Sequence, residues 1–353
     1  MKNTKLLFLI SIAVIFGVNL FSGSINSYYY QIIIYCGINI VLATSLNLIN
    51  GYTGQFSLGH AGFMAIGAYV SAALSTYLAP TLLSVFGDGT LGRSAWFILV
   101  LLMGGTGAAI AGIVVGVPSL RLKGDYLAIT TLGFSEIIRV TIQNLTSIGA
   151  SQGFRGVYVY DNGVRSLEMV PELSSVAYKF YDIPKYTDFF WAFLVVAIII
   201  FGITNLMRST YGRGFIAVKD DEIAAEAMGV NTTRFKVTAF VIGAFFAGVA
   251  GGLYAHFLQY INPEDFNFLR SVEIVAMVIL GGMGSTFGVV LAAIILTVLP
   301  ELLRDVQQYR MIIYALLLII MMLLRPQGLF GIKLERKKKK VSPEEAPEAT
   351  LKD

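Results

Sequence analysis

The sequence predicts an all-α polytopic membrane protein with about 8–10 transmembrane helices, including one short pair broken by glycines. Three observations carry this prediction. Of the 353 residues, 56% are hydrophobic and only 14% are charged, whereas soluble domains carry about 25% charged residues. The mean hydropathy is +0.72. The apolar residues also fall in repeated runs long enough for helical spans, which argues against a membrane β-barrel.

The predicted spans follow one another along most of the chain. They are 6–21, 28–49, 56–79, 95–117, 125–146, 189–207, 235–258, 272–299 and 311–324. The first run follows Lys2 and Lys5, so it fits either an uncleaved span or a secretory signal peptide. We favour the uncleaved span because further spans follow almost at once. The single cysteine, Cys36, lies inside an apolar run and is expected to be a packed thiol.

Basic residues predict which side of the membrane each connection faces. Cytoplasmic flanks carry an excess of Lys and Arg, so Lys2 and Lys5 place the N-terminus inside the cell. Counting spans then puts a 147–187 insertion outside and the 208–235 connector inside. The basic tail, 333–353, must also be inside, which requires 272–299 to reverse direction at its glycines. That reversal is either a re-entrant pair or two crossings.

The predicted domain organisation is therefore simple. Residues 1–332 form the transmembrane domain, and the Pro/Glu-rich tail is expected to be disordered, with membrane lipid as a candidate contact of its basic cluster. Within the insertion, the sequence VYVY followed by DNG predicts a small β-hairpin. Three residues near the outer side, His256, Glu264 and Asp265, are candidate contacts for an external partner.

The 208–235 connector is a charged, amphipathic segment between two apolar spans. Acidic residues at 220–222 suit a helix N-terminus, and Gly229 suits its end. An apolar stripe at helical spacing lies between them. The connector has about thirty residues, whereas most connectors have about 2–8. Either the helix is an ordinary solvated or headgroup element, or another protein binds it.

If the chain moves a solute uphill across the membrane, its energy source bears on that choice. The chain contains no phosphate-binding loop of the form Gly-x-x-x-x-Gly-Lys-[Ser/Thr], so it is expected to be non-catalytic. Uphill transport would need an ion gradient or a partner ATPase, and the connector is the long cytoplasmic element on which such a partner could dock.

Polar residues inside predicted spans are candidates for lining a transport pathway, because polar groups at membrane depth face a cavity or another helix. Glu136 and Arg139 share one helix face and predict either an internal ion pair or gate residues. The glycine break allows backbone amides to point into a cavity, or it is a tight turn with close helix contacts. The pathway candidates are Asn47, Gln55, Ser57, His60, Glu136, Arg139, Gly281, Gly282 and Gly284.

Five ordered blocks resemble the permeases of branched-chain amino acid ABC importers, and the LivM type more than its LivH-type sister. The blocks are GQFSLGHAGFMAIGAY at 54–69, YLAITTLGFSEIIR at 126–139, DEIAAEAMG at 221–229, AMVILGGMGS at 276–285 and RPQGLF at 325–330. The resemblance implies a permease of a bacterial or archaeal cell membrane. It also implies partners: a homologous LivH-type permease, two subunits that bind ATP and Mg²⁺, and an extracytoplasmic solute-binding protein. No cofactor, metal or nucleic acid is implied for this chain.

The connector resembles the coupling loop of these importers, whose common form is Glu-Ala-Ala-x-x-x-Gly. This chain departs from it, because Ile223 stands six residues before Gly229 and Glu222 comes one earlier. The residues implied to couple to the ATPase are Arg213, Asp221, Glu222, Ala224, Ala225, Glu226, Ala227, Met228 and Gly229.

The resemblance favours import of leucine, isoleucine and valine, and three other functions stay open. Permeases for urea or short-chain amides look alike. A self-sufficient secondary transporter or channel would move solute alone, and a scaffold would move none.

Overall fold

The structure is a computed structural model. It describes residues 11–19, 25–78, 89–119, 124–160, 165–167 and 177–306, with isolated positions at 23, 122 and between 309 and 323. The basic tail, the RPQGLF block and the DNG turn at 161–163 lie outside the described residues.

Long helices form most of the described chain, as predicted, and the protein is an all-α polytopic membrane protein with a small β insertion. The helices are α2 (Ser27–Asn47), α3 (His60–Tyr77), α5 (Thr90–Ser119), α6 (Asp125–Asn144), α7 (Phe189–Arg208), α8 (Thr210–Asp220), α9 (Glu222–Ala227), α10 (Thr232–Leu258), α11 (Phe268–Gly281) and α12 (Thr286–Leu302). Within the described residues, four helices are long and apolar enough to cross a membrane: Ser27–Tyr52, Thr90–Pro118, Phe189–Arg208 and Thr232–Leu258.

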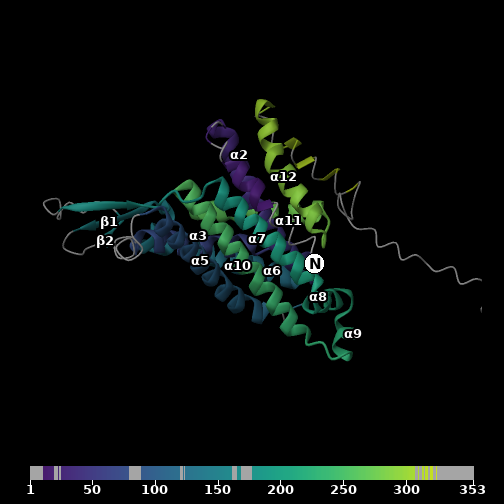
Figure 1. Cartoon of the computed structure of the whole chain (residues 1–353). Helices are drawn as coiled ribbons and strands as arrows, with labels where there is room; N and C mark the ends of the chain where they lie inside the picture. The colour runs from purple at the N-terminus through teal and green to yellow at the C-terminus, as the bar shows by residue number, and fades with distance from the viewer. Residues whose placement is uncertain are drawn as a thin grey trace, which may run out of the picture.

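Helix α10 lies at the centre of the bundle and packs against α2, α3 and α5 (Figure 1). Close approach at one crossing depends on glycines. A Cβ built on Gly104 would lie 2.9 Å from the Gly67 carbonyl oxygen, and one on Gly248 would lie 2.8 Å from the Gly104 oxygen. Small residues let helix backbones approach in a membrane, where dispersion contacts rather than the hydrophobic effect drive packing.

The third predicted span begins later than hydropathy indicates. Its helix starts at His60, and residues 54–59 form neither a helix nor a strand. Gly54 has a φ of +69°, a left-handed conformation that interrupts the helix. Side chains then replace the lost helical bonds, because Asn50 both accepts from the Ser57 amide (3.2 Å) and donates to the Ser57 carbonyl (3.3 Å). The backbone amide and carbonyl of Ser57 are therefore both satisfied within the bundle.

The predicted reversal at the glycines is confirmed. Helices α11 and α12 run antiparallel, because Asn39 of α2 bonds to the start of one and the end of the other. Its Oδ1 accepts from Arg270 (2.7 Å), and its Nδ2 donates to Thr297 (2.8 Å). The turn between the two helices lies beside the end of α2, where Tyr52 and Thr286 share a hydrogen bond of 2.7 Å.

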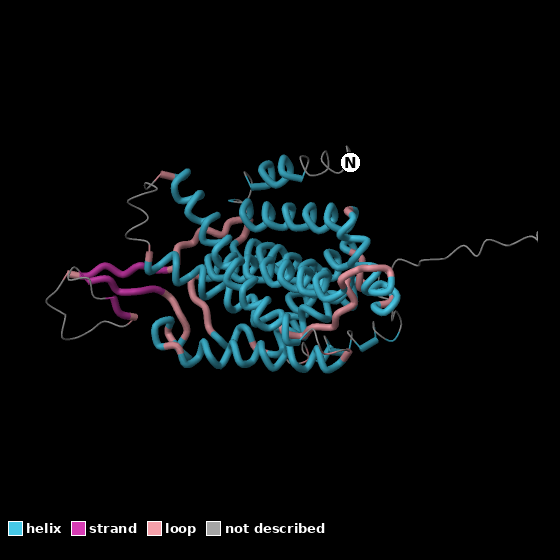
Figure 2. The backbone as a smooth tube through the Cα atoms, turned by 90° about the horizontal axis from the view of Figure 1, so that it is seen from below, coloured by secondary structure: helices cyan, strands magenta, loops and turns pink. Residues whose placement is uncertain are grey.

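A small antiparallel sheet projects from one end of the bundle (Figure 2). Strand β1 (Gly156–Tyr160) pairs with β2 (Arg165–Ser166), which confirms the predicted hairpin, and also with β3 (Tyr178–Asp182). Helices α8 and α9 lie at the opposite end (Figure 1). We call these the sheet end and the loop end.

Candidate functional site

Two short helices, α8 and α9, form the loop end. Asp221 separates them and caps α9, since its Oδ1 accepts from the amides of Ile223 (2.9 Å) and Ala224 (3.0 Å). Gly229 follows α9 with a φ of +83°, the left-handed conformation that ends many helices. The start and stop that the sequence predicts for α9 are both confirmed. The separate helix α8 before it was not predicted.

Helix α9 presents an apolar surface to its surroundings. Ile223 is 75% exposed and Met228 is 84% exposed, and Ala224 and Ala227 are exposed between them. Ala225 differs, because it is only 5% exposed and faces the rest of the chain. Of the predicted coupling residues, Ala224, Ala227 and Met228 therefore form an exposed apolar face together with Ile223 of the predicted apolar stripe. We call Ile223, Ala224, Ala227 and Met228 the α9 face.

The acidic residues of α9 hold the helix against the bundle. Glu222 pairs with Lys236 of α10 (Oε1 to Nζ, 2.5 Å), and the Thr232 hydroxyl donates to Glu226 (2.5 Å). Lys236 is a buried residue, so water screens this pair less than one at the surface. Both carboxylates are thus engaged within the chain.

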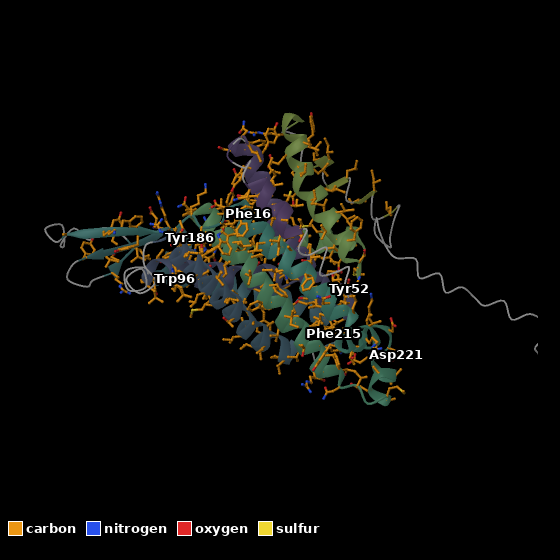
Figure 3. The ribbon with its side chains drawn as sticks, in the orientation of Figure 1. Phe16, Tyr52, Trp96, Tyr186, Phe215 and Asp221 are labelled. Carbon is orange, nitrogen blue, oxygen red and sulfur yellow. The ribbon has the colours of Figure 1, made fainter. Side chains whose placement is uncertain are left out.

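Helix α8 is fixed mainly by aromatic packing. The buried Phe215 packs edge-on against Phe235, with ring centroids 5.6 Å apart, and also contacts Leu48 and Ala239. Figure 3 shows Tyr52, Phe215 and Asp221 together at the loop end. Arg213 lies on an exposed part of α8, where its guanidinium donates to the Thr210 hydroxyl (3.3 Å).

The pathway candidates Asn47, Ser57 and His60 meet where α2 ends. Helix α2 finishes in a π-helix, Leu48–Tyr52, a form often found at functional sites. His60 is fully buried, and its Nε2 lies 2.8 Å from the Ser45 hydroxyl. Ser57 is also buried and is held by Asn50. The structure thus brings Asn47, Ser57 and His60 to the region of this helix break.

Several polar atoms in this region have no hydrogen-bond partner among the described residues. They are Asn47 Nδ2, Gln55 Nε2 and Oε1, and His60 Nδ1. Buried polar groups are normally hydrogen-bonded, and an unsatisfied one costs about 1–3 kcal/mol. These atoms are therefore the unused hydrogen-bonding groups of the region.

The glycine turn is closely packed against α2. Gly282 and Gly284 have φ angles of +93° and +91°, and a Cβ on Gly281 would overlap the backbone of Val289. The Gly284 amide donates to Asn47 Oδ1 (2.9 Å). Of the two interpretations of the glycine break, these contacts favour a tight turn with close helix packing.

The predicted ion pair in α6 is confirmed and extends further than expected. Arg139 Nε donates to Glu136 (2.8 Å), and its Nη1 donates to Glu264 (2.9 Å) in the 3₁₀ helix Pro263–Phe266. Gln143 also donates to Glu264 (2.7 Å). This cluster is near the sheet end, because Ile261 bridges to Phe154 beside β1. It lies away from the helix break that holds Asn47 and His60.

Two other predicted residues are buried. Cys36 is a packed, free thiol, as expected. His256 is fully buried and bonds to Ser75 (2.6 Å) and to the Gly252 carbonyl (2.8 Å), so the expectation that it contacts an external partner was wrong. Its position near a helix end suggested exposure, but α10 carries it into the bundle.

Sequence reasoning missed Lys219, the lysine of the last turn of α8. Its ammonium donates to the Gly51 carbonyl of the π-helix (2.6 Å). The charge was visible in the sequence, but a bond between residues 168 positions apart leaves no local signal.

Together, the polytopic helical bundle, the capped helix at one end and the polar helix breaks define a membrane transport permease. The family described as "Branched-chain amino acid transport system / permease component" matches residues 28–324. The chain belongs to this family.

Named relatives agree with this membership. The permease protein LivM of the high-affinity branched-chain amino acid transport system of Salmonella typhimurium is 38% identical over 313 residues, which cover 83% of this chain and 67% of the relative. A probable LivM of Methanocaldococcus jannaschii is 25% identical and covers 86% and 93% of the two chains. The sister permease LivH of Escherichia coli is 26% identical and covers 82% and 90%. No solved structure matches the chain.

Proposed function

We propose that the chain is the non-catalytic permease subunit of an ATP-binding cassette importer and carries branched-chain amino acids across the cell membrane. The names of its LivM relatives support the substrate class. A LivH-type permease would be the second membrane subunit, since LivH is similar to this chain over 82% of this chain's length and is named for the same kind of transport system. Two ATPases and an external solute-binding protein would complete the transporter.

The α9 face is the observation that carries the coupling part of the proposal. Four apolar or small side chains point outward from a helix that is capped by Asp221 and anchored through Glu222 and Glu226. A rigid, exposed apolar patch at the tip of a loop is typical of a protein interaction site. The docked partner would be the ATPase subunit, so the loop end would face the cytoplasm and the sheet end the outside.

The polar residues at the end of α2 and the start of α3 would line the pathway along which the solute crosses the membrane. Asn47, Gln55 and His60 carry the unpartnered buried atoms, so they are better suited to face a zwitterionic solute or its water than Glu136 and Arg139, whose charges satisfy each other and Glu264. Gln55 is the strongest candidate, because both of its side-chain polar atoms lack a partner among the described residues.

Docking is tested with Met228→Glu. A charge on the α9 face, at its most exposed residue, should abolish co-purification with the ATPase subunits, because desolvating a carboxylate without a partner is costly, while membrane expression and thermal stability stay unchanged. Leu145→Glu is the matched control, since Leu145 is an exposed apolar residue near the sheet end. Normal co-purification of the Met228→Glu protein would contradict the docking assignment.

The solute class is tested by uptake in the complete transporter. Labelled leucine should accumulate and unlabelled valine should compete with it. Transport of urea without competition by leucine would instead support the amide permease. Uptake by the chain alone in liposomes, driven by an ion gradient, would identify a secondary transporter.

A further inference from the structure

Lys219 lies in α8, which together with α9 we call the docking loop. It contacts two interruptions of the transmembrane helices, the π-helix Leu48–Tyr52 and the glycine turn between α11 and α12. Its Nζ donates to the Gly51 carbonyl at 2.6 Å, and a Cβ built on Gly284 would lie 3.4 Å from the same nitrogen. The Lys219 stem also packs against Gly54, at the start of the polar segment 54–59, since a Cβ on Gly54 would lie 3.1 Å from Lys219 Cγ. One side chain of α8 thus reaches the π-helix, the start of the polar segment and the glycine turn.

The two breaks are also joined directly to each other. Asn47 accepts from the Gly284 amide at 2.9 Å, and Tyr52 bonds to Thr286 at 2.7 Å. A movement of the π-helix must therefore move the glycine turn, unless these bonds break. Lys219, which bonds to the π-helix from α8, would therefore influence the positions of both the π-helix and the glycine turn.

We propose that Lys219 is the positioning residue through which movement of the docking loop reaches the π-helix and the glycine turn. This inference rests on the proposed function, in which an ATPase moves α9 and α8. Other contacts between α8 and the bundle include the apolar packing of Phe215 in one cluster with Leu48, Phe235 and Ala239, which is non-directional. The Lys219 bond is directional and charge-assisted, so it fixes the position of α8 relative to Gly51.

The position of the accepting carbonyl supports the assignment. The last carbonyls of a helix lack partners within the helix and carry partial negative charge, so an ammonium there stabilises one arrangement of the end. A π-helix differs from an α-helix by its hydrogen-bond register. The ammonium of Lys219, by bonding to a carbonyl of the π-helix, favours the π-helical hydrogen-bond register. Its displacement would allow a different register in this segment.

The link is measured first in the full chain alone, reconstituted in lipid nanodiscs. Spin labels are attached at Ile216→Cys on α8 and Met283→Cys in the glycine turn, both exposed, in a Cys36→Ser background. The distance distribution should be narrow, should broaden in Lys219→Met and should be narrow again in Lys219→Arg. Lys179→Met, a charge-matched change on β3 at the sheet end, should leave it narrow. An unchanged distribution in Lys219→Met would overturn the inference.

The functional consequence is measured in the complete transporter in proteoliposomes. Lys219→Met should bind the ATPase subunits as well as the unmodified chain does, yet solute carried per ATP hydrolysed should fall about tenfold, the scale of one lost charge-assisted hydrogen bond. Lys219→Arg should restore most of the ratio. A lysine that merely caps the helix would lower the yield of folded protein and leave the ratio unchanged, and that result would overturn the inference.

Two further outcomes separate this inference from the function on which it rests. If Lys219→Met loses the ATPase subunits, the residue belongs to the docking surface, so the inference fails while the proposed function stands. If the unmodified chain itself does not bind the ATPase subunits, the proposed function fails and the inference falls with it.

Discussion

Gly51 is a residue at which a single added methyl group should matter. A Cβ there would overlap Asn47 Oδ1 and the Gly284 backbone nitrogen, the two atoms of the hydrogen bond that joins α2 to the glycine turn. The same residue offers its carbonyl to Lys219. Three segments far apart in the sequence therefore meet at one glycine.

Gly51→Ala should lower stability by about 1–3 kcal/mol, as overpacking a closely packed site does. The change is measured as a lower temperature of thermal unfolding in detergent. Gly202→Ala is the control, because nothing lies within 4 Å of a Cβ at that position inside α7, where alanine also favours the helix. Equal unfolding temperatures for the two variants would contradict the packing argument.

The sequence identified most polar residues of the helix break but none of their partners. Asn47, Gln55 and His60 were visible because polar side chains are rare in apolar runs. Asn47 bonds to Gly284, which lies 237 positions away, and such pairings follow from tertiary packing. Helical spacing, by contrast, is local: it placed Ala224 but not Ala225 on the apolar stripe, and Ala225 is buried, although both were among the implied coupling residues.

At the scale of elements, the charged cluster of α6 braces one helix against a distant turn. Arg139 is shared between Glu136 in its own helix and Glu264 in the 3₁₀ helix Pro263–Phe266. Glu264 is 61% exposed at its side chain, so its share of the stabilisation is reduced by water. One cation, Arg139, thus lies between two anions from different elements and links them.

Exchanging the charges of Glu136 and Arg139 should therefore rescue the single reversals only in part. The exchanged pair restores the bond within α6, but it places a carboxylate against Glu264. Adding Glu264→Gln to the exchanged pair should recover further stability, by about 0.5–1 kcal/mol. The free energies of unfolding of the two single reversals, the exchanged pair and the triple variant decide this. Full rescue by the double exchange alone would show that Glu264 contributes nothing.

Helix bounds were predicted well where the physics is local. Asp221 and Gly229 mark the ends of α9 because a side-chain cap and a left-handed glycine act within one turn of the helix. The start of α3 was predicted too early, since hydropathy does not register a polar segment whose backbone bonds go to Asn50 and Thr131. The strand β3 was missed because the pairing partner, β1, lies far from it in sequence.

At the scale of the whole molecule, the two ends of the bundle differ in character. The sheet end carries strands and the Glu264 cluster, whereas the loop end carries α8, α9 and the glycine turn. A reversal at the glycines was required by the count of basic flanks, and the antiparallel α11 and α12 meet that requirement. The sidedness of the two ends remains our prediction.

Thiol labelling tests that sidedness in cells that express the chain alone in a Cys36→Ser background. Tyr260→Cys, near the sheet end, should react with a membrane-impermeant maleimide in intact cells. Met228→Cys and Met283→Cys should react only after permeabilisation, because both lie at the loop end. All three residues are well exposed, so a failure to react reports sidedness. Labelling of Met228→Cys in intact cells would reverse the predicted orientation.

The exposed α9 face also bears on the fate of the chain inside the cell. Chaperones and proteases bind exposed apolar side chains, so they can recognise a copy without its ATPase by the exposed Ile223 and Met228. Docking of the ATPase would bury these two side chains. The abundance of the permease should then follow the supply of its partner, with surplus copies degraded, and one short helix would serve both energy transfer and the stoichiometry of assembly.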